Sequence, residues 1–346
     1  MKTLGTIIIA LAALAGVAYF VAPSISQFPS FSARASSGPS THLLLAVDVD
    51  ALRRQQLENV ADEMAMALRA GNPAIRYTGR GVVADAARIR LVSASDADRA
   101  TSAIRTIAQS EDGAQAFAIT SGPDGLIEAR ISEERLRALT HFAATQSIEV
   151  LRRRLVGFGR GVTVEQTEDD RILIRAQGVA DMGGLHRAVG VTGLLSLHLV
   201  REISAEAAAV GNIPPGTMIA QPHPSDPNAS PEVVERRPRF TGERLVRASP
   251  STDPVTNEFV LSFQLDSEGT RIFCRITRDH VGNRFAILLD NQVLTAPRIN
   301  EPICGGSGQI SGNFTAQSAN ELAVLLRAGA LPAPLVLIEE GVDYSP

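Results

Sequence analysis

The histidines and carboxylates of this chain do not have the spacing of the common catalytic or metal-binding motifs. None of the six histidines is followed by another at i+3 or i+4, and there is no H-E-x-x-H motif. Asp48 and Asp50 would share one face of a strand, where paired carboxylates could bind a cation. We favour a solvated strand end in which Asp50 caps the following helix. The sequence predicts no catalytic, cofactor-binding or metal-binding residue.

A glycine-rich segment at residues 305–308 (GGSG) has only a superficial likeness to a phosphate-binding loop. It lacks the Lys-Ser/Thr ending of a P-loop and does not follow a parallel-strand crossover pattern. Ser307 is not in a G-x-S-x-G context, so a serine nucleophile is not predicted either. We interpret these residues as a flexible corner before a strand, and we expect the protein not to be an enzyme.

Cys274 and Cys304 are the two cysteines of the chain, and they form no C-x-x-C motif. In an oxidising compartment a disulfide between them would close a loop of about 30 residues and stabilise the fold by roughly 3–4 kcal/mol. The sequence also allows two buried free thiols. We favour the free thiols, because the spacing does not give the separation of the two Cα atoms.

The composition is that of a protein with two or three domains and no nucleic-acid partner. The chain has 346 residues, of which 45% are hydrophobic. Its formal net charge is −4, and the charges do not form long single-sign runs. The chain therefore lacks the basic patch that binding to nucleic acid requires.

An uncharged apolar stretch at residues 4–22 is predicted to cross a membrane. At about 1.5 Å per residue, its helical length nearly matches a bilayer core of about 30 Å. We favour an uncleaved anchor over a secretory signal, because the run is long and the nearest A-x-A pattern lies at residues 33–35. Lys2 precedes the stretch, so the N-terminus is predicted to be cytoplasmic and the rest of the chain periplasmic.

Strand and helix patterns then alternate twice in the order β-α-β-β-α-β, which is typical of a ferredoxin-like fold. The first series covers residues 42–125 and the second covers residues 126–202. We infer the duplication from the order of the elements and not from residue identity between the two series. Residues that can cap helices precede the predicted helices, namely Asp50, Ser132, Asp266 and Thr315.

The last ordered block, residues 238–335, is predicted to be a separate αβ domain. Two apolar runs at residues 285–289 and 292–296 flank Asp290-Asn291, a two-residue signal for a β-hairpin turn. The predicted fold class is therefore α+β, with one N-terminal transmembrane helix, two ferredoxin-like units and this terminal domain.

Four long strings of this terminal domain are distinctive. They are LDSEGTRIF (265–273), TRDHVGNRFAILLDNQVLTAPRINEPI (277–303), GGSGQISGNFT (305–315) and LLRAGALPAPL (325–335). These strings resemble the SecD family of bacterial protein-export subunits, in which they belong to the head of the large periplasmic domain.

The second ferredoxin-like series also resembles the family, at the base of the same periplasmic domain. The similar strings lie at residues 148–179 and 191–200. The L-D-L-x-G-G signature of the family is absent, and only HLLLAVDVD at residues 42–50 remains of that region. The sequence therefore does not support the base geometry that this signature maintains in the family.

The resemblance implies a non-enzymatic accessory subunit of the Sec machinery whose head holds a translocating polypeptide. The implied partners are SecF, SecY-type translocon components and unfolded secretory polypeptides, and the implied location is the bacterial inner membrane. No cofactor is expected. The proton-driven helices of the family would follow residue 335, and we expect a partner to supply them. The polypeptide-binding residues expected on an apolar sheet are Phe285, Ile287, Leu289, Val293 and Ile310.

Two other interpretations remain open. The first is a periplasmic scaffold or truncated relic of SecD without export activity, favoured by the missing signature. The second is a periplasmic hydrolase, which would require clustered histidines and acidic residues. The predicted segments are the anchor (1–23), a tether (24–41), the two ferredoxin-like units (42–125 and 126–202), a proline-rich irregular linker (203–237), the head (238–335) and a C-terminal tail (336–346).

Overall fold

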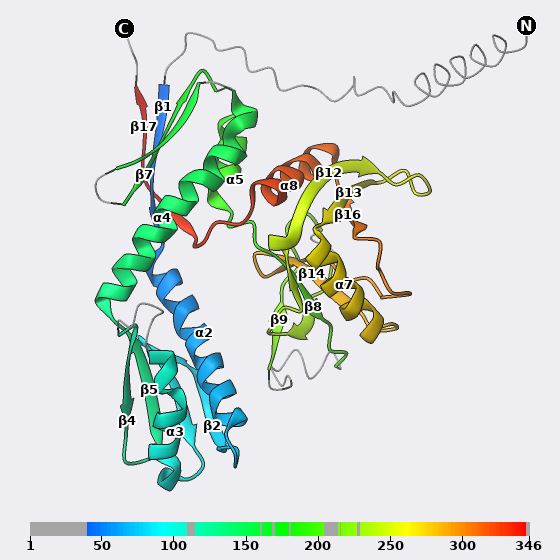
Figure 1. The fold of residues 1–346 in the computed structure, drawn as a ribbon. Helices are drawn as coiled ribbons and strands as arrows, with labels where there is room; N and C mark the ends of the chain where they lie inside the picture. The colour runs from blue at the N-terminus through cyan, green and yellow to red at the C-terminus, as the bar shows by residue number, and fades with distance from the viewer. Residues whose placement is uncertain are drawn as a thin grey trace, which may run out of the picture. The chain divides into compact units, whose positions relative to one another are not determined.

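The computed structural model describes residues 40–108, 115–159, 161–167, 170–179, 181–203, 214, 216–226 and 229–343 (Figure 1). These residues form a mixed α/β protein with several sheets. The predicted anchor at residues 4–22 and most of the predicted tether lie outside them. None of the helices that the described residues form is both long enough and apolar enough to cross a membrane.

Strands from both ends of the described chain meet in one antiparallel sheet, the β1 sheet, with the spatial order β17-β1-β7-β6. Two helices pack their apolar faces against it, and Leu43 and Leu45 of β1 lie in the resulting core. The elements are β1 (Ser40–Val47), α4 (Glu133–Leu155), β6 (Val162–Gln166), β7 (Ile172–Gln177), α5 (Met182–Gly190) and β17 (Leu335–Asp343).

A second antiparallel sheet, the β5 sheet, has the order β2-β3-β5-β4. Two helices pack against one face of it, where Ile89 and Ile127 are fully buried. The elements are α2 (Val49–Ala70), β2 (Tyr77–Val83), β3 (Ala86–Leu91), α3 (Ala97–Ile104), β4 (Phe117–Ser121) and β5 (Leu126–Ile131).

Both sheets have the 4-1-3-2 strand order of a ferredoxin-like fold, but each takes its first strand from the other repeat. Strand β1 directly precedes α2, yet it pairs with β7 and β17. Strand β5 directly precedes α4, yet it pairs with β3 and β4. The predicted division at residues 125 and 126 therefore assigns two strands to the wrong sheets. The two strands have similar alternating burial, so the sequence pattern does not show which sheet accepts which strand.

The remaining elements form the head, whose core joins a four-stranded sheet of order β11-β8-β14-β15 to a three-stranded sheet of order β12-β13-β16. Helices α7 and α8 pack against this core. The elements are β8 (Leu195–Leu199), β9 (Thr217–Ala220), β10 (Glu232–Glu235), β11 (Phe240–Thr241), β12 (Leu245–Thr252), β13 (Phe259–Leu265), α7 (Ser267–Asp279), β14 (Phe285–Leu289), β15 (Gln292–Thr295), β16 (Ser307–Phe314) and α8 (Ala316–Ala328).

Strand β8 belongs to the head and not to the second ferredoxin-like unit that it was expected to close. All five of its residues are buried, as in a central strand covered on both faces. The closing position in the β1 sheet is taken by β17, most of which was expected to be a C-terminal tail. Pro334 lies one residue before β17 and so does not interrupt the strand pairing.

The predicted irregular linker at residues 203–237 contains two paired strands, β9 and β10. Its prolines lie mainly outside these two strands, so they do not block the pairing. Ala220 and Val234 pack with Ala286 and Leu288 of β14, which gives the pair an apolar contact with the rest of the head.

Side-chain caps start the longer helices. Ser132, Asp266 and Thr315 accept hydrogen bonds from backbone N–H groups in the first turns of α4, α7 and α8, as predicted. Helix α2 is capped by Asp48, whose Oδ1 accepts from the N–H of Ala51 at 2.9 Å, and not by Asp50 as expected. Strand β1 ends at Val47 and helix α2 begins at Val49, which places Asp48 at the N-cap.

Candidate functional site

An apolar cavity of about 140 Å³ lies in the head, lined by residues of both larger head sheets and of α7. Four phenylalanines form much of its wall. The ring of Phe273 lies 5.6 Å from that of Phe240 and 6.4 Å from those of Phe263 and Phe285, measured between centroids. Phe263 and Phe285 are only partly buried, so the aromatic wall reaches the protein surface.

Three of the five residues predicted to bind polypeptide, Phe285, Ile287 and Ile310, line this cavity. Strand alternation explains the placement, because Phe285 and Ile287 are two residues apart on β14 and share a face. Leu289 lies in the same core but not on the cavity wall. Val293 faces the small cluster around Val234 and is 3% exposed.

Several wall residues were not predicted, although the sequence contains a signal for one of them. Phe273 is the middle member of a buried row on α7, Gly269, Phe273 and Thr277, spaced four residues apart. This spacing marks the inward face of a helix in the sequence alone. Leu197 and Phe263 enter the wall through pairing between distant strands, which no local pattern indicates.

Strand β16 borders the cavity and forms an edge of its sheet. Gly308, Gln309, Ile310 and Ser311 contribute to the lining. One side of β16 pairs with β13, and among the described residues no strand pairs with its other side. Gln309 and Ser311 are exposed while Ile310 between them is buried. The backbone of an added strand could therefore pair here next to the apolar wall.

The titratable groups of the head have structural partners and do not converge on the cavity. Burial lowers the pKa of His198, although a hydrogen bond of 2.7 Å between its Nδ1 and the carbonyl oxygen of Glu235 opposes this effect. Burial also lowers the pKa of His223. Within the described parts of the chain, no three His, Cys, Asp or Glu residues are grouped in a way that could hold a metal ion.

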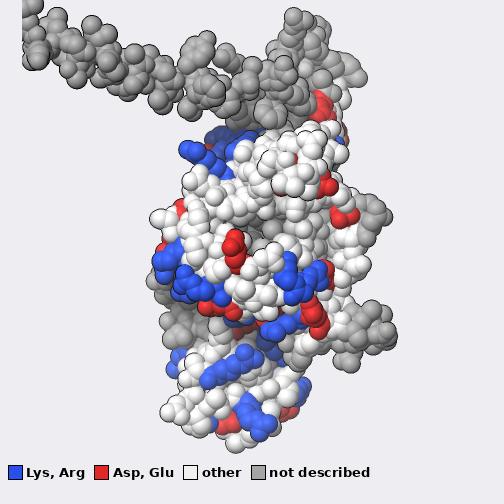
Figure 2. Space-filling view, turned by 90° about the vertical axis from the view of Figure 1, so that its right-hand side faces the viewer, with Lys and Arg blue, Asp and Glu red and all other residues white. Residues whose placement is uncertain are grey.

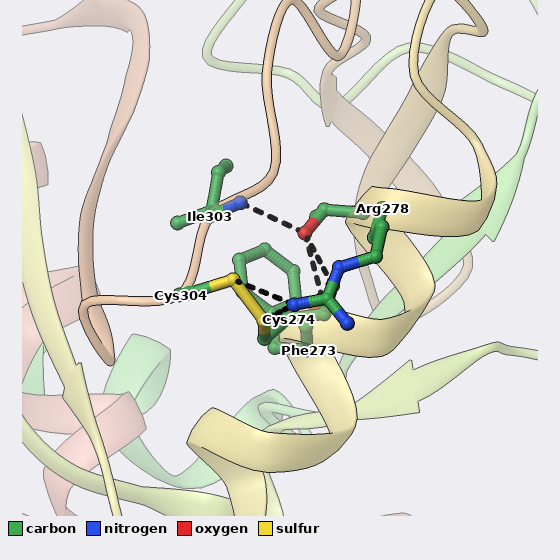
Figure 3. The surroundings of a disulfide bond; sticks show 6 residues. Phe273, Cys274, Arg278, Ile303 and Cys304 are labelled. Carbon is green, nitrogen blue, oxygen red and sulfur yellow. Dashed lines mark hydrogen bonds between the residues drawn. A yellow bond between two sulfur atoms is a disulfide. The ribbon is translucent and has the colours of Figure 1, made fainter.

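Cys274 of α7 and Cys304 form a disulfide with a sulfur–sulfur distance of 1.97 Å and a Cα separation of 4.4 Å (Figure 3). The expectation of two free thiols is therefore wrong. Residue 304 lies in the connection between β15 and β16, which runs next to α7, a contact that the spacing of the cysteines could not show. Next to the disulfide, the N–H of Ile303 donates to Thr277 Oγ1 at 2.9 Å.

The face of the molecule seen in Figure 2 carries acidic and basic residues interspersed with uncharged ones. Many charged side chains of the described residues are paired. Arg284, for example, binds Glu232 through two hydrogen bonds of 2.6 and 3.2 Å and so ties β14 to β10. This pair therefore has a structural role in the head.

Comparison with known proteins identifies related sequences. Residues 218–333 match the family model described as the SecDF P1 head subdomain. The SecD translocase subunit of Rickettsia bellii is 38% identical over 301 residues, which cover 86% of this chain and 56% of that protein. The SecD subunit of Acetobacter pasteurianus is 35% identical over 307 residues, 87% of this chain and 57% of that protein.

A crystal structure of SecDF in a super-membrane-facing form is 26% identical, with a TM-score of 0.48, and covers 58% of this chain and 28% of that one. The chain spans about 56% of the length of the curated relatives that it matches. The matched segment and the similarity across most of the chain support one identification: the chain is SecD-related, and its residues 218–333 are a SecDF P1 head subdomain.

Proposed function

We propose that this protein acts in protein export as a non-enzymatic SecD-like accessory subunit that holds an extended apolar segment of a translocating polypeptide. The proposed binding site is the cavity in the head together with the free edge of β16. Of the residues named from the sequence, Phe285, Ile287 and Ile310 would contact the polypeptide, whereas Leu289 and Val293 would support the sheet behind it.

The observation that carries this proposal is the position of the cavity beside an unpaired strand edge. An added strand gains backbone hydrogen bonds that do not depend on its sequence, and alternate side chains can enter an apolar pocket. This combination suits a subunit that must accept many different unfolded chains. A volume of about 140 Å³ accommodates one or two side chains of the polypeptide, so the strand edge would have to supply the rest of the contact.

Photocrosslinking in native membranes tests the proposal. A photoreactive phenylalanine analogue replaces the exposed Gln309 of β16 in one variant and the exposed Thr120 of β4 in a matched control. We expect a secretory polypeptide arrested during export to crosslink at position 309 and not at position 120. If neither or both positions crosslink while the protein is still associated with translocon components, the head does not bind the polypeptide specifically and the scaffold interpretation gains support.

The proposed location is the bacterial inner membrane, with residues 4–22 as the anchor and the described residues in the periplasm. The proposed partners are SecF and SecY-type components, by analogy with the SecD relatives. The disulfide supports the location, because disulfides form in oxidising compartments such as the bacterial periplasm.

A further inference from the structure

We propose that the Cys274–Cys304 disulfide is a thiol–disulfide exchange site, and that its reduction by a dithiol releases the segment carrying Ile303 from the wall of the head cavity. The exchange does not depend on the proposed function. Its effect on polypeptide binding does rest on that function.

The first support is access to the sulfur atoms. Cys304 is exposed and lies next to Gly305, which is also exposed, whereas Cys274 is half-buried on α7. An attacking thiolate can therefore reach the sulfur of Cys304 without unfolding the head. Exposed disulfides are generally the labile ones, whereas buried disulfides resist exchange.

The second support is a positive charge placed beside both sulfur atoms. The guanidinium of Arg278, one turn after Cys274 on α7, donates to Cys274 Sγ at 3.4 Å and lies 3.9 Å from Cys304 Sγ (Figure 3). A neighbouring arginine stabilises a thiolate, which makes it a better leaving group. Arg278 also attracts the negatively charged attacking thiolate.

These positions define the chemical step. One thiolate of the dithiol attacks Cys304 Sγ and forms a mixed disulfide, and the electron pair of the broken bond leaves on Cys274 Sγ beside Arg278. The second thiol of the reductant then displaces Cys304. The protein gains two electrons and, when both thiolates are protonated, two protons. The dithiol is oxidised to its own disulfide.

The consequence for the cavity follows from the neighbouring residues. Ile303 lines the cavity and directly precedes Cys304. In the described structure it is held there by the disulfide and by the hydrogen bond from its N–H to Thr277 Oγ1. Backbone hydrogen bonds at Ile299 and Gly306 anchor the two ends of this segment. Once the disulfide is reduced, the part between these anchors is held by the partly buried hydrogen bond from Ile303 to Thr277 and by the partial burial of the Ile303 side chain, so we expect this part to open.

The rate of reduction tests the role of Arg278. Full-length protein in detergent is treated with dithiothreitol under native conditions, and free thiols are counted over time by a maleimide mass shift. Arg278→Gln should slow the reduction about fivefold, the loss expected from one charge at about 4 Å in water. The matched control Arg275→Gln, which removes an exposed charge next to Cys274, should change the rate by less than about twofold.

Equal rates for the wild type and both variants would overturn the role of Arg278. Reduction only at denaturant concentrations that unfold the head would overturn the exchange site itself.

Hydrogen exchange tests the opening of the cavity without any polypeptide. Reduced protein and the Cys274→Ala/Cys304→Ala variant should both exchange faster than oxidised protein over residues 297–306, with little change in β3 or β5. Unchanged exchange in this segment would overturn the release of Ile303. Crosslinking at position 309 provides the separate readout: its failure in both redox states rejects the proposed function and leaves the exchange site standing.

Discussion

Arg154 is the side chain whose removal we expect to disturb the fold most. It is 1% exposed, and its guanidinium donates to four carbonyl oxygens. The acceptors belong to α5, to the connection between α5 and β8, and to the residue after α8, namely Ala188, Val191, Thr192 and Gly329. Burial lowers its pKa to about 10, so it stays charged at neutral pH.

The same contact explains a glycine in the connection to β8. Gly193 has a φ of +76°, and a Cβ atom there would lie 2.6 Å from Nη2 of Arg154. Its N–H donates to the carboxylate of Asp290 in the β14–β15 turn at 2.9 Å. A side chain at position 193 would therefore meet both a backbone penalty and a steric conflict with the buried guanidinium.

Replacing Arg154 by methionine should destabilise the protein by about 3–5 kcal/mol, because it leaves four carbonyl groups without their donor in a buried site. Urea denaturation followed by circular dichroism measures this loss. The control is Arg153→Met, since Arg153 is the exposed neighbour on the same helix. A loss below about 1 kcal/mol for Arg154→Met would mean that water replaces the missing donors.

At the scale of the elements, the exchange of first strands makes the two ferredoxin-like units depend on each other. Each of these two strands belongs to one sheet, and the helix that directly follows it in sequence packs against the other sheet. Leu43 of β1 packs in the core of α4 and α5, and Ile127 of β5 packs in the core of α2 and α3. Each sheet therefore needs a strand that lies directly before a helix of the other unit.

This arrangement predicts a crossed response to two matched substitutions. Leu43→Ala and Ile127→Ala should each cost about 2–5 kcal/mol, because both side chains are fully buried. In hydrogen exchange, Leu43→Ala should expose β7 and α5, and Ile127→Ala should expose β3 and α3. The reverse pattern, in which each substitution affects the helix that follows it in sequence, would contradict the observed pairing.

Local signals in the sequence predicted the elements well, and long-range pairing limited the rest. The hairpin at Asp290-Asn291 was predicted because aspartate and asparagine tolerate the positive φ of a tight hairpin turn. Both residues adopt positive φ in the structure, 49° and 65°. Ser132, Asp266 and Thr315 were predicted caps for the same local reason. The sheet to which β1, β5, β8 and β17 each belong could not be predicted. Alternation of apolar and polar residues shows which face of a strand is buried, but it does not show which strand pairs with it.

The candidate site was partly predictable for the same reason. Phe285 and Ile287 share a strand face that alternation reveals, and both line the cavity. Val293 is also an apolar strand residue, but it pairs with Leu288 and shares the face of that residue, which is opposite to the face of Ile287. The sequence did not show this cross-strand partner. The disulfide required the folded positions of α7 and the segment before β16.

At the scale of the whole molecule, the chain is built by two insertions into the β1 sheet. The β5 sheet is inserted between β1 and α4, and the head is inserted between α5 and β17. The two connections to the head are joined by a backbone hydrogen bond of 2.8 Å from Leu331 to Thr192. Arg154 binds the same pair of connections, at Thr192 and Gly329.

Affinity purification of the full-length, membrane-extracted protein tests the proposed place of the whole molecule in export. Mass spectrometry should recover SecY, SecF or unfolded secretory polypeptides with it. Intact SecD purified from the same cells serves as the positive control. Recovery of these partners with SecD and not with this protein would reject the export role and favour the scaffold interpretation.

The double insertion also sets an order for folding during synthesis. The elements of the β5 sheet, with α2 and α3, are nearly contiguous in sequence, and so are the elements of the head. Each of these two parts can therefore fold as soon as its own residues have emerged from the ribosome. Strand β1 is made first but gains its final partner, β17, only about 290 residues later, which at about 5–20 residues per second is roughly 15–60 s. During that interval the apolar side chains of β1 have no complete sheet. The earliest of the described strands is thus the one that waits longest for its partner, and it has the greatest need of protection from aggregation while the chain is being made.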